Sequence, residues 1–171
     1  MRAEIRLAAP KDAREIAEVH VASWRWAYRG IVADAALEGL SVDAREEMWR
    51  SWFDSKEARA SLFVAIERGS VVGFAGGGEA RGADATPDTA EVRTIYLLEA
   101  AAGNGTGRAL LAALTDGLRA HGYERATLWV LEGNERTLRF YEAACWHPDG
   151  GREGYEIGGT SYPVVRYTTE L

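Results

Sequence analysis

The chain contains very little cysteine and very little lysine: among its 171 residues, Cys145 is the single cysteine, and Lys11 and Lys56 are the two lysines. One cysteine excludes an internal disulfide framework and is typical of proteins from a reducing compartment. Basic residues form no stripe, and the formal net charge is −6. These features argue against nucleic acid as a partner and are compatible with cationic ligands such as amines.

Long hydrophobic runs are absent as well. No segment approaches the roughly 20 apolar residues that a membrane-spanning helix needs, and the first residues contain no apolar stretch long enough for a secretory signal. We therefore expect a cytoplasmic protein without a membrane partner. The three histidines, His20, His121 and His147, are scattered without the spacing of metal ligands, so no metal site is expected.

The sequence does provide enough apolar material for a core. Hydrophobic residues make up 47% of the chain, and a domain of this length buries about 70% of its unfolded surface. No repeat, linker or low-complexity segment divides the chain. We expect one domain over residues 1–171.

Hydrophobic periodicity predicts the element order β-α-α-β-β-β-α-β-α-β-β. Helices are expected over about 10–29, 44–53 (with Asp43 as cap), 107–121 and 134–144. Strands are expected over about 4–7, 62–67, 71–77, 91–98 and 127–131, and a hairpin over 155–167 turns at Gly158 and Gly159. Consecutive strands early in the chain and a β-α-β unit later predict an α/β fold: a mixed sheet with helices on both faces.

A glycine-rich loop, Gly103-Asn104-Gly105-Thr106-Gly107-Arg108, lies between a predicted strand and a predicted helix. Glycines let the backbone curl around an anion, and the helix start adds unpaired N–H groups, so a phosphate or pyrophosphate fits there. The alternative is a flexible turn that needs positive φ angles. The loop lacks the lysine of nucleotide-triphosphate-binding loops, and Arg108 occupies the third glycine position of the dinucleotide fingerprint, so both motifs fail.

Three segments together suggest a family. Residues 102–107 are similar to the signature Arg/Gln-x-x-Gly-x-Gly/Ala, residues 128–134 to a strand followed by asparagine, and residues 134–146 to a helix with the pattern Asn-x6-Tyr-Glu-x-Ala-Gly-Phe. In this order and spacing they resemble the GNAT family of N-acyltransferases over essentially the whole chain. Ala102 departs from the family pattern by replacing the usual Arg or Gln, and Cys145 and Trp146 replace the usual Gly-Phe pair.

The resemblance implies a site for acetyl-CoA between splayed fourth and fifth strands. The backbone of Ile95, Tyr96 and Leu97 would pair with the pantetheine arm. Asn134 would hydrogen-bond the arm or the amine side of the cofactor, although it also suits a helix cap. The pyrophosphate would lie in the glycine loop, formed by Gly103, Asn104, Gly105, Thr106, Gly107 and Arg108.

The resemblance also implies the chemistry, which is the attack of an amine on a thioester. A substrate ammonium must first lose a proton, and Glu91 on the fourth strand is the expected base. Tyr141 is the expected acid for the departing thiolate, and the N–H of Tyr96 or Leu97 would stabilise the oxyanion. The alternatives are that Glu91 is a solvated edge carboxylate and Tyr141 a packed aromatic.

The acceptor is expected to be a primary amine of a small molecule or peptide, attacked directly in a ternary complex. Trp24, Trp26 and Tyr28 lie where the family roofs its acceptor site, although core packing is the default for aromatics. Because Ala102 removes a family side chain, a catalytically inactive acyl-CoA sensor stays open, as does transfer of a longer acyl group. A homodimer is common in the family.

Overall fold

The computed structural model describes residues 3–55, 57 and 59–171, and within these residues the strands form one seven-stranded sheet in the order β1-β2-β3-β4-β5-β7-β6. Neighbouring strands are antiparallel except β4 and β5, which are parallel. The strands are β1 (Glu4–Leu7), β2 (Ser61–Glu67), β3 (Ser70–Glu79), β4 (Thr89–Leu97), β5 (Arg125–Leu131), β6 (His147–Ile157) and β7 (Thr160–Glu170). The helices are η1 (Pro10–Asp12), α1 (Ala13–Ala27), α2 (Asp34–Glu38), α3 (Val42–Ser55), η2 (Glu99–Ala101), α4 (Thr106–Ala120) and α5 (Glu135–Glu142).

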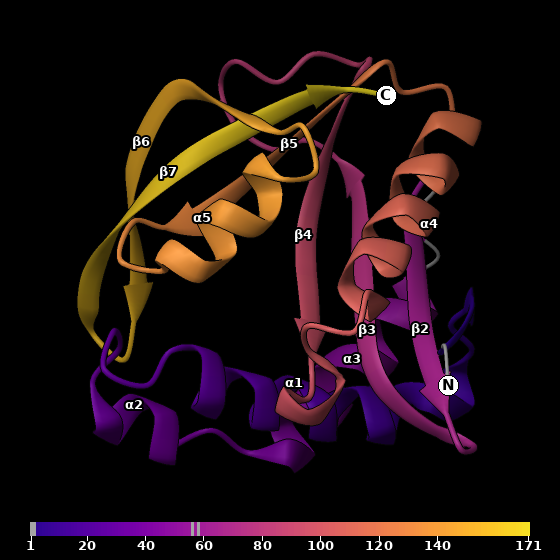
Figure 1. Cartoon of the computed structure of the whole chain (residues 1–171), viewed down its shortest axis with the longest axis vertical. Coiled ribbons are helices and arrows are strands. Elements are labelled where there is room, and N and C mark those ends of the chain that lie inside the picture. The colour runs from indigo at the N-terminus through magenta and orange to yellow at the C-terminus, as the bar shows by residue number, and fades with distance from the viewer. Residues whose placement is uncertain (1–2, 56, 58) are drawn as a thin grey trace.

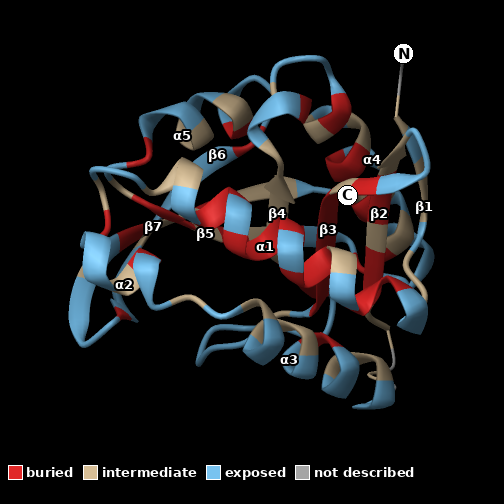
Figure 2. Cartoon of the chain, turned by 90° about the horizontal axis from the view of Figure 1, so that it is seen from below, coloured by how far each residue is buried: buried red, intermediate tan, exposed pale blue. Residues whose placement is uncertain are grey.

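Helices cover both faces of the sheet, and the hydrophobic pattern of each helix selects its face (Figure 1). On α4, Leu110, Leu114 and Leu118 recur at helical spacing and pack into one core cluster with strands β3, β4 and β5. On α1, Ile16 and Val19 pack with residues of α3 and the opposite sheet face in a second cluster. The buried stripe along α1 and the mostly exposed surface of α3 are visible in Figure 2. The predicted α/β architecture is confirmed.

The sheet opens between β4 and β5. These strands pair only over Thr89–Glu91 and Arg125–Thr127, after which they run apart like the arms of a V (Figure 1). At that point the register of β3 against β4 shifts, so that Arg93 is an extra residue in β4. Such a bulge bends and twists its strand, which directs β4 away from β5. The predicted splay of the fourth and fifth strands is present.

A glycine makes this bulge possible. At Gly77, opposite the bulge, an added Cβ would lie 2.5 Å from the carbonyl oxygen of Glu91. Only a residue without Cβ permits that approach. Gly77 therefore permits the bulge at which β4 turns away from β5.

Three local predictions need correction. The short helix α2 was not expected. The cap of α3 is Ser41, whose Oγ accepts a hydrogen bond from the N–H of Ala44 (3.3 Å), because the helix already begins at Val42. Strand β6 begins at His147 and not near Tyr155, because it is an exposed edge strand that pairs only with β7 and therefore has no alternating apolar pattern. The predicted turn at Gly158 and Gly159 is confirmed.

An ion pair between a buried carboxylate and a partly exposed guanidinium ties the start of the chain to the first helix. Asp12 is 3% exposed and receives two hydrogen bonds from the Arg6 guanidinium, of 2.7 and 2.9 Å. The backbone N–H of Ala9 donates a third, of 2.8 Å. The Arg6 guanidinium holds the pKa of Asp12 below its ordinary value of 3.8, with the Ala9 N–H acting in the same direction. The ionised form of Asp12 therefore stabilises the fold.

We expect Asp12→Asn to lower the free energy of unfolding by about 2 kcal/mol at neutral pH, because Arg6 is left without its partner. The contribution is present above the ordinary pKa of 3.8 and is lost as the pH falls through the lower folded-state pKa. Urea unfolding of both proteins at neutral and acidic pH measures this difference. The matched control is Asp43→Asn, because the Asp43 side chain is 86% exposed in its pair with Arg14 and should contribute less than about 0.5 kcal/mol. An Asp12→Asn effect as small as the control would contradict the prediction.

Candidate active site

A cavity of about 770 Å³ lies where β4 and β5 separate; we call it the cleft cavity. Its walls come from α1, β4, the loop before α4, β5 and α5. Segments far apart in the sequence thus meet at one opening in the sheet. The residues singled out from the sequence that line it are Trp26, Tyr28, Ile95, Tyr96, Leu97, Gly103, Gly105, Gly107, Arg108, Asn134 and Tyr141.

One edge of β4 faces this cavity with free backbone groups. The N–H of Leu98 donates to the carbonyl of Val72 on β3, at 2.9 Å. Because antiparallel pairing alternates along a strand, Tyr96 also directs its backbone toward β3, whereas Ile95 and Leu97 direct theirs toward the separated β5. The unpaired edge can therefore accept an extended partner at Ile95 and Leu97, and Tyr96 contributes its side chain.

The glycine loop presents backbone donors at the start of α4. Gly103 and Gly105 adopt φ angles of +80° and +93°, a conformation that glycine permits without strain. The side chain of Asn104 accepts from the N–H of Thr106 at 3.0 Å. The next N–H groups of the helix, those of Gly107 and Arg108, have no intrahelical acceptor. This geometry fits an anion such as a phosphate, with Asn104 and Thr106 supporting the loop outside the cavity lining.

Among the polar side chains that α5 and its cap contribute to the cleft cavity are Asn134 and Tyr141. Asn134 caps the helix by accepting from the N–H of Thr137 at 3.3 Å, as its position predicted. Tyr141 is 4% exposed, and burial raises the pKa of its phenol well above the ordinary value. Its hydroxyl therefore stays protonated at neutral pH and is able to donate a proton.

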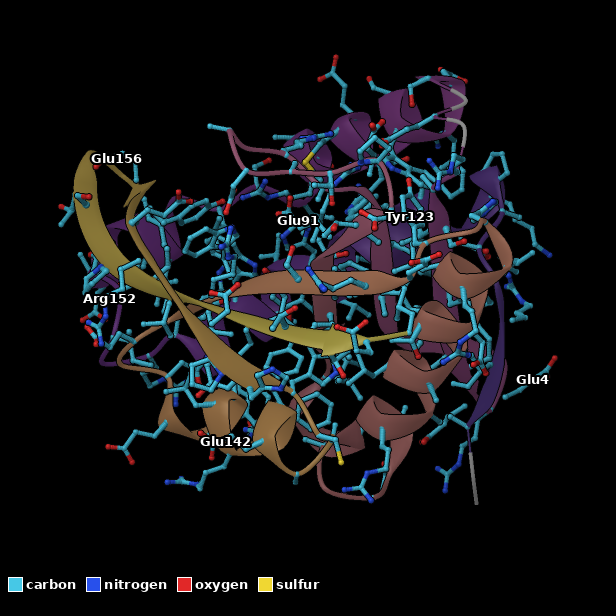
Figure 3. The ribbon with its side chains drawn as sticks, turned by 90° about the horizontal axis from the view of Figure 1, so that it is seen from above. Glu4, Glu91, Tyr123, Glu142, Arg152 and Glu156 are labelled. Carbon is cyan, nitrogen blue, oxygen red and sulfur yellow. The ribbon has the colours of Figure 1, made fainter. Side chains whose placement is uncertain are left out.

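Glu91 lies in an adjoining cavity of about 740 Å³, which we call the side cavity. The two cavities share wall residues from α1, β4 and β5, among them Tyr28 and Tyr96. Glu91 is the last residue of β4 that pairs with β5, and its carboxylate accepts from the N–H of Arg81 at 3.3 Å. Burial raises the pKa of Glu91. Figure 3 shows Glu91 in the interior, whereas Glu4, Glu142 and Glu156 lie at the periphery.

The arginines around the side cavity are largely neutralised within the protein. Arg93 forms two hydrogen bonds of 2.8 Å with Glu57. Arg166 pairs with Asp84 at 2.6 Å and with Asp149 at 2.7 Å, and Arg152 pairs with Glu132 at 2.7 Å. Two carboxylates of the lining, Glu91 and Glu153, form no ion pair with the residues that the structure describes. By the same measure, the lining has one guanidinium without an ion pair, that of Arg81. The side cavity therefore suits a cationic or amine ligand better than an anion.

Comparisons with known proteins agree with this geometry. The model of the acetyltransferase (GNAT) family matches residues 18–145. The chain belongs to the GNAT acetyltransferase family. It is 37% identical over 163 residues to the uncharacterized N-acetyltransferase YuaI of Bacillus subtilis, covering 94% of this chain and 89% of that protein. It is 28% identical over 168 residues to the probable N-acetyltransferase Rv2775 of Mycobacterium tuberculosis, covering 95% and 91%.

Solved structures share the fold. The PaiA N-acetyltransferase of Thermoplasma acidophilum, in complex with coenzyme A, aligns with a TM-score of 0.76 at 19% identity and covers both chains fully. YncA of Salmonella typhimurium, with acetyl-CoA, aligns with a TM-score of 0.75 at 22% identity, covering 100% of this chain and 95% of that one. The predicted family and the predicted enzyme class, an N-acetyltransferase, are confirmed. The predicted donor, acetyl-CoA, agrees with the ligands of these structures.

Within residues 3–55, 57 and 59–171, no helix is long and apolar enough to cross a membrane. In the same part of the chain, His, Cys, Asp and Glu side chains form no group of three or more that is placed to hold a metal ion.

Sequence reasoning missed several side chains of the GNAT cleft. Trp129, Arg136 and Phe140 line the cleft cavity although no motif marks them. Phe140 lies next to Tyr141 on α5, but consecutive helical residues point in different directions, so the position of Tyr141 does not by itself place Phe140 on the cavity wall. Trp129 is part of an alternating strand, but it faces an opening that only the separation of β4 from β5 creates.

The aromatic residues of α1 divide between core and cavity. Trp26 and Tyr28 line the cleft cavity, whereas Trp24 is 7% exposed and lines the side cavity. On the same helix, His20 stacks on Tyr96 of β4, with the ring centroids 5.1 Å apart and an angle of 17° between the ring planes. Trp49 Nε1 donates to His20 Nδ1 at 3.3 Å. The buried stack of His20 on Tyr96 holds β4 against α1 beside the cleft cavity.

His20 should stay neutral in the folded enzyme, because burial, assisted by the nearby charge of Arg45, lowers its pKa from 6.5 to about 3. The unfolded chain binds this proton below 6.5, so the folded state loses stability as the pH falls from 6.5 toward 3. We expect His20→Phe to remove this loss, which approaches 1.4 kcal/mol per pH unit. Urea unfolding at several pH values measures it. A His20 ring signal in NMR spectra that titrates near the ordinary histidine value would contradict the prediction.

Proposed function

We propose that this GNAT enzyme transfers the acetyl group of acetyl-CoA directly to a primary amine of a small molecule or peptide in a ternary complex. One observation carries the proposal: the cleft cavity and the side cavity meet at the separation of β4 from β5. The first offers backbone donors that suit phosphates and an unpaired strand edge. The second offers a half-buried carboxylate and a surplus of negative charge.

The chain would hold acetyl-CoA, which supplies an activated acetyl group, with its backbone. Ile95 and Leu97 extend hydrogen-bonding groups along the free edge of β4, where the pantetheine arm adds like a strand. The N–H groups of Gly107 and Arg108 at the start of α4 suit the pyrophosphate. Asn134 caps α5 with its amide oxygen, which leaves its NH₂ group to donate to the arm.

Glu91 acts as the base. Its raised pKa makes its carboxylate a better proton acceptor than an exposed one, and the optimum for a base lies near the working pH. The side cavity brings the amine to this carboxylate, and the aromatic rings of Trp24 and Tyr28 suit its alkyl chain or charge. Glu91 thereby produces the neutral amine that attacks the acetyl carbon.

Leu97 and Tyr141 act on the other side of the reacting centre. The N–H of Leu97 points into the cleft and stabilises negative charge on the thioester oxygen; Tyr96 does not, because its N–H faces β3. Tyr141 donates its proton to the departing sulfur. Burial raises the pKa of Tyr141, which keeps the phenol protonated at neutral pH but does not by itself favour the transfer. The second proton that the attacking nitrogen loses restores the phenol.

Acetyl-CoA should raise the thermal midpoint of the protein. At a hundred times the dissociation constant, a ligand adds about 2.7 kcal/mol, or roughly 5–11 °C for a chain of this size. Differential scanning fluorimetry measures the shift, with ATP and NAD as controls that carry phosphates without the pantetheine arm. Equal shifts with ATP would indicate a general nucleotide site, and no shift with millimolar acetyl-CoA would contradict the proposal.

Glu91→Gln and Tyr141→Phe should each lower kcat by roughly a hundred- to ten-thousand-fold while acetyl-CoA still binds. Release of free CoA in the presence of a panel of amines measures turnover, and the same panel with longer acyl donors establishes whether acetyl is preferred. Each variant has a matched control at a residue outside both cavities. Glu156→Gln, at the periphery (Figure 3), is the control for Glu91→Gln. Tyr123→Phe, which changes a buried phenol that is 2% exposed, is the control for Tyr141→Phe. Binding of acetyl-CoA without turnover of any amine by the wild type would favour the inactive sensor.

A further inference from the structure

One cation of the cleft cavity forms no ion pair or hydrogen bond with the residues that the structure describes. Arg136, near the start of α5, lines the cavity together with Trp26 of α1. Its guanidinium lies 3.9 Å from the centroid of the Trp26 ring. The side chain therefore reaches from one wall of the cavity to another.

The protein does little to stabilise this charge. Arg136 forms no ion pair among the residues that the structure describes, and burial lowers the pKa of its guanidinium, opposed only by longer-range attraction from Glu99. The positive end of the α5 dipole also opposes a cation at this place. Arg139, on the same helix, contrasts with it: it pairs with Glu135 at 3.2 Å and is 69% exposed.

The stacking leaves the guanidinium ready to bind an anion. A ring contact occupies the flat face of the group, whereas its N–H donors point outward in the plane. Planar donors of this kind bind phosphate oxygens in pairs. Coenzyme A carries a pyrophosphate and a 3′-phosphate, and at position 102, where the family has Arg or Gln, this chain has alanine.

We propose that Arg136, held by Trp26, binds a phosphate group of acetyl-CoA. The inference rests on the proposed function, because it takes acetyl-CoA as the occupant of the cleft cavity. Arg136 is thus a binding residue that anchors the phosphate end of the donor and takes no part in the chemistry. Trp26 supplies the surface that orients the guanidinium.

The test compares donors that differ in their phosphates. For wild type and Arg136→Gln, calorimetry gives the dissociation constants of acetyl-CoA and its 3′-dephospho form, and thermal shifts at up to millimolar concentration give that of S-acetylpantetheine, which has no phosphate. We expect Arg136→Gln to weaken acetyl-CoA binding about 10- to 100-fold and to leave S-acetylpantetheine unchanged. If the loss persists with the dephospho form, the pyrophosphate is the partner; if it disappears, the 3′-phosphate is.

Two further variants complete the test. Arg139→Gln is the matched control and should bind every donor like the wild type, whereas Trp26→Ala should weaken acetyl-CoA binding in part. Unliganded thermal midpoints show that each variant folds. Unchanged acetyl-CoA binding by Arg136→Gln, or an equal loss with S-acetylpantetheine, would overturn the inference. Failure of the wild type to bind any donor would instead overturn the proposed function, so the two failures are distinguishable.

Discussion

The separation of β4 from β5 is the constraint on which the rest of the site depends. A sheet normally satisfies every backbone group of its inner strands through neighbouring strands. Here pairing stops after Glu91 and Thr127, and the bulge at Arg93 turns β4 away. The result is a strand edge in the middle of the sheet that can pair with a ligand. The cleft cavity and the side cavity adjoin at this opening and share wall residues. A donor in one and an acceptor in the other can therefore meet inside the protein.

The elements around the opening are held in place by packing and capping contacts within the protein. Leucines of α4 anchor the glycine loop from one face of the sheet. On the other face, the stack of His20 on Tyr96 fixes β4 against α1. Asn134 fixes the start of α5 by capping it. Each supporting contact is buried, which allows the groups that face the cavities to stay free of strong internal partners.

Charge is distributed unevenly between the two cavities. Arginines around the side cavity are paired with carboxylates such as Glu57 and Asp149, which leaves a negative surplus toward an amine. The cleft cavity instead contains Arg136, which forms no ion pair within the described part of the chain, and the positive end of α4. This division suits an anionic donor on one side and a cationic acceptor on the other.

The sequence by itself determined the family, the α/β class, the element order apart from α2, and the position of the glycine loop at the start of α4, because local periodicity and glycine spacing are properties of neighbouring residues. It also placed Ile95, Leu97, Asn134 and Tyr141, through motif spacing. Only the tertiary structure decided that Tyr96 directs its backbone toward β3, that Glu91 lies in the side cavity, and that Arg136 stacks on Trp26. These facts depend on strand pairing and on contacts between residues more than a hundred positions apart, which no local pattern encodes.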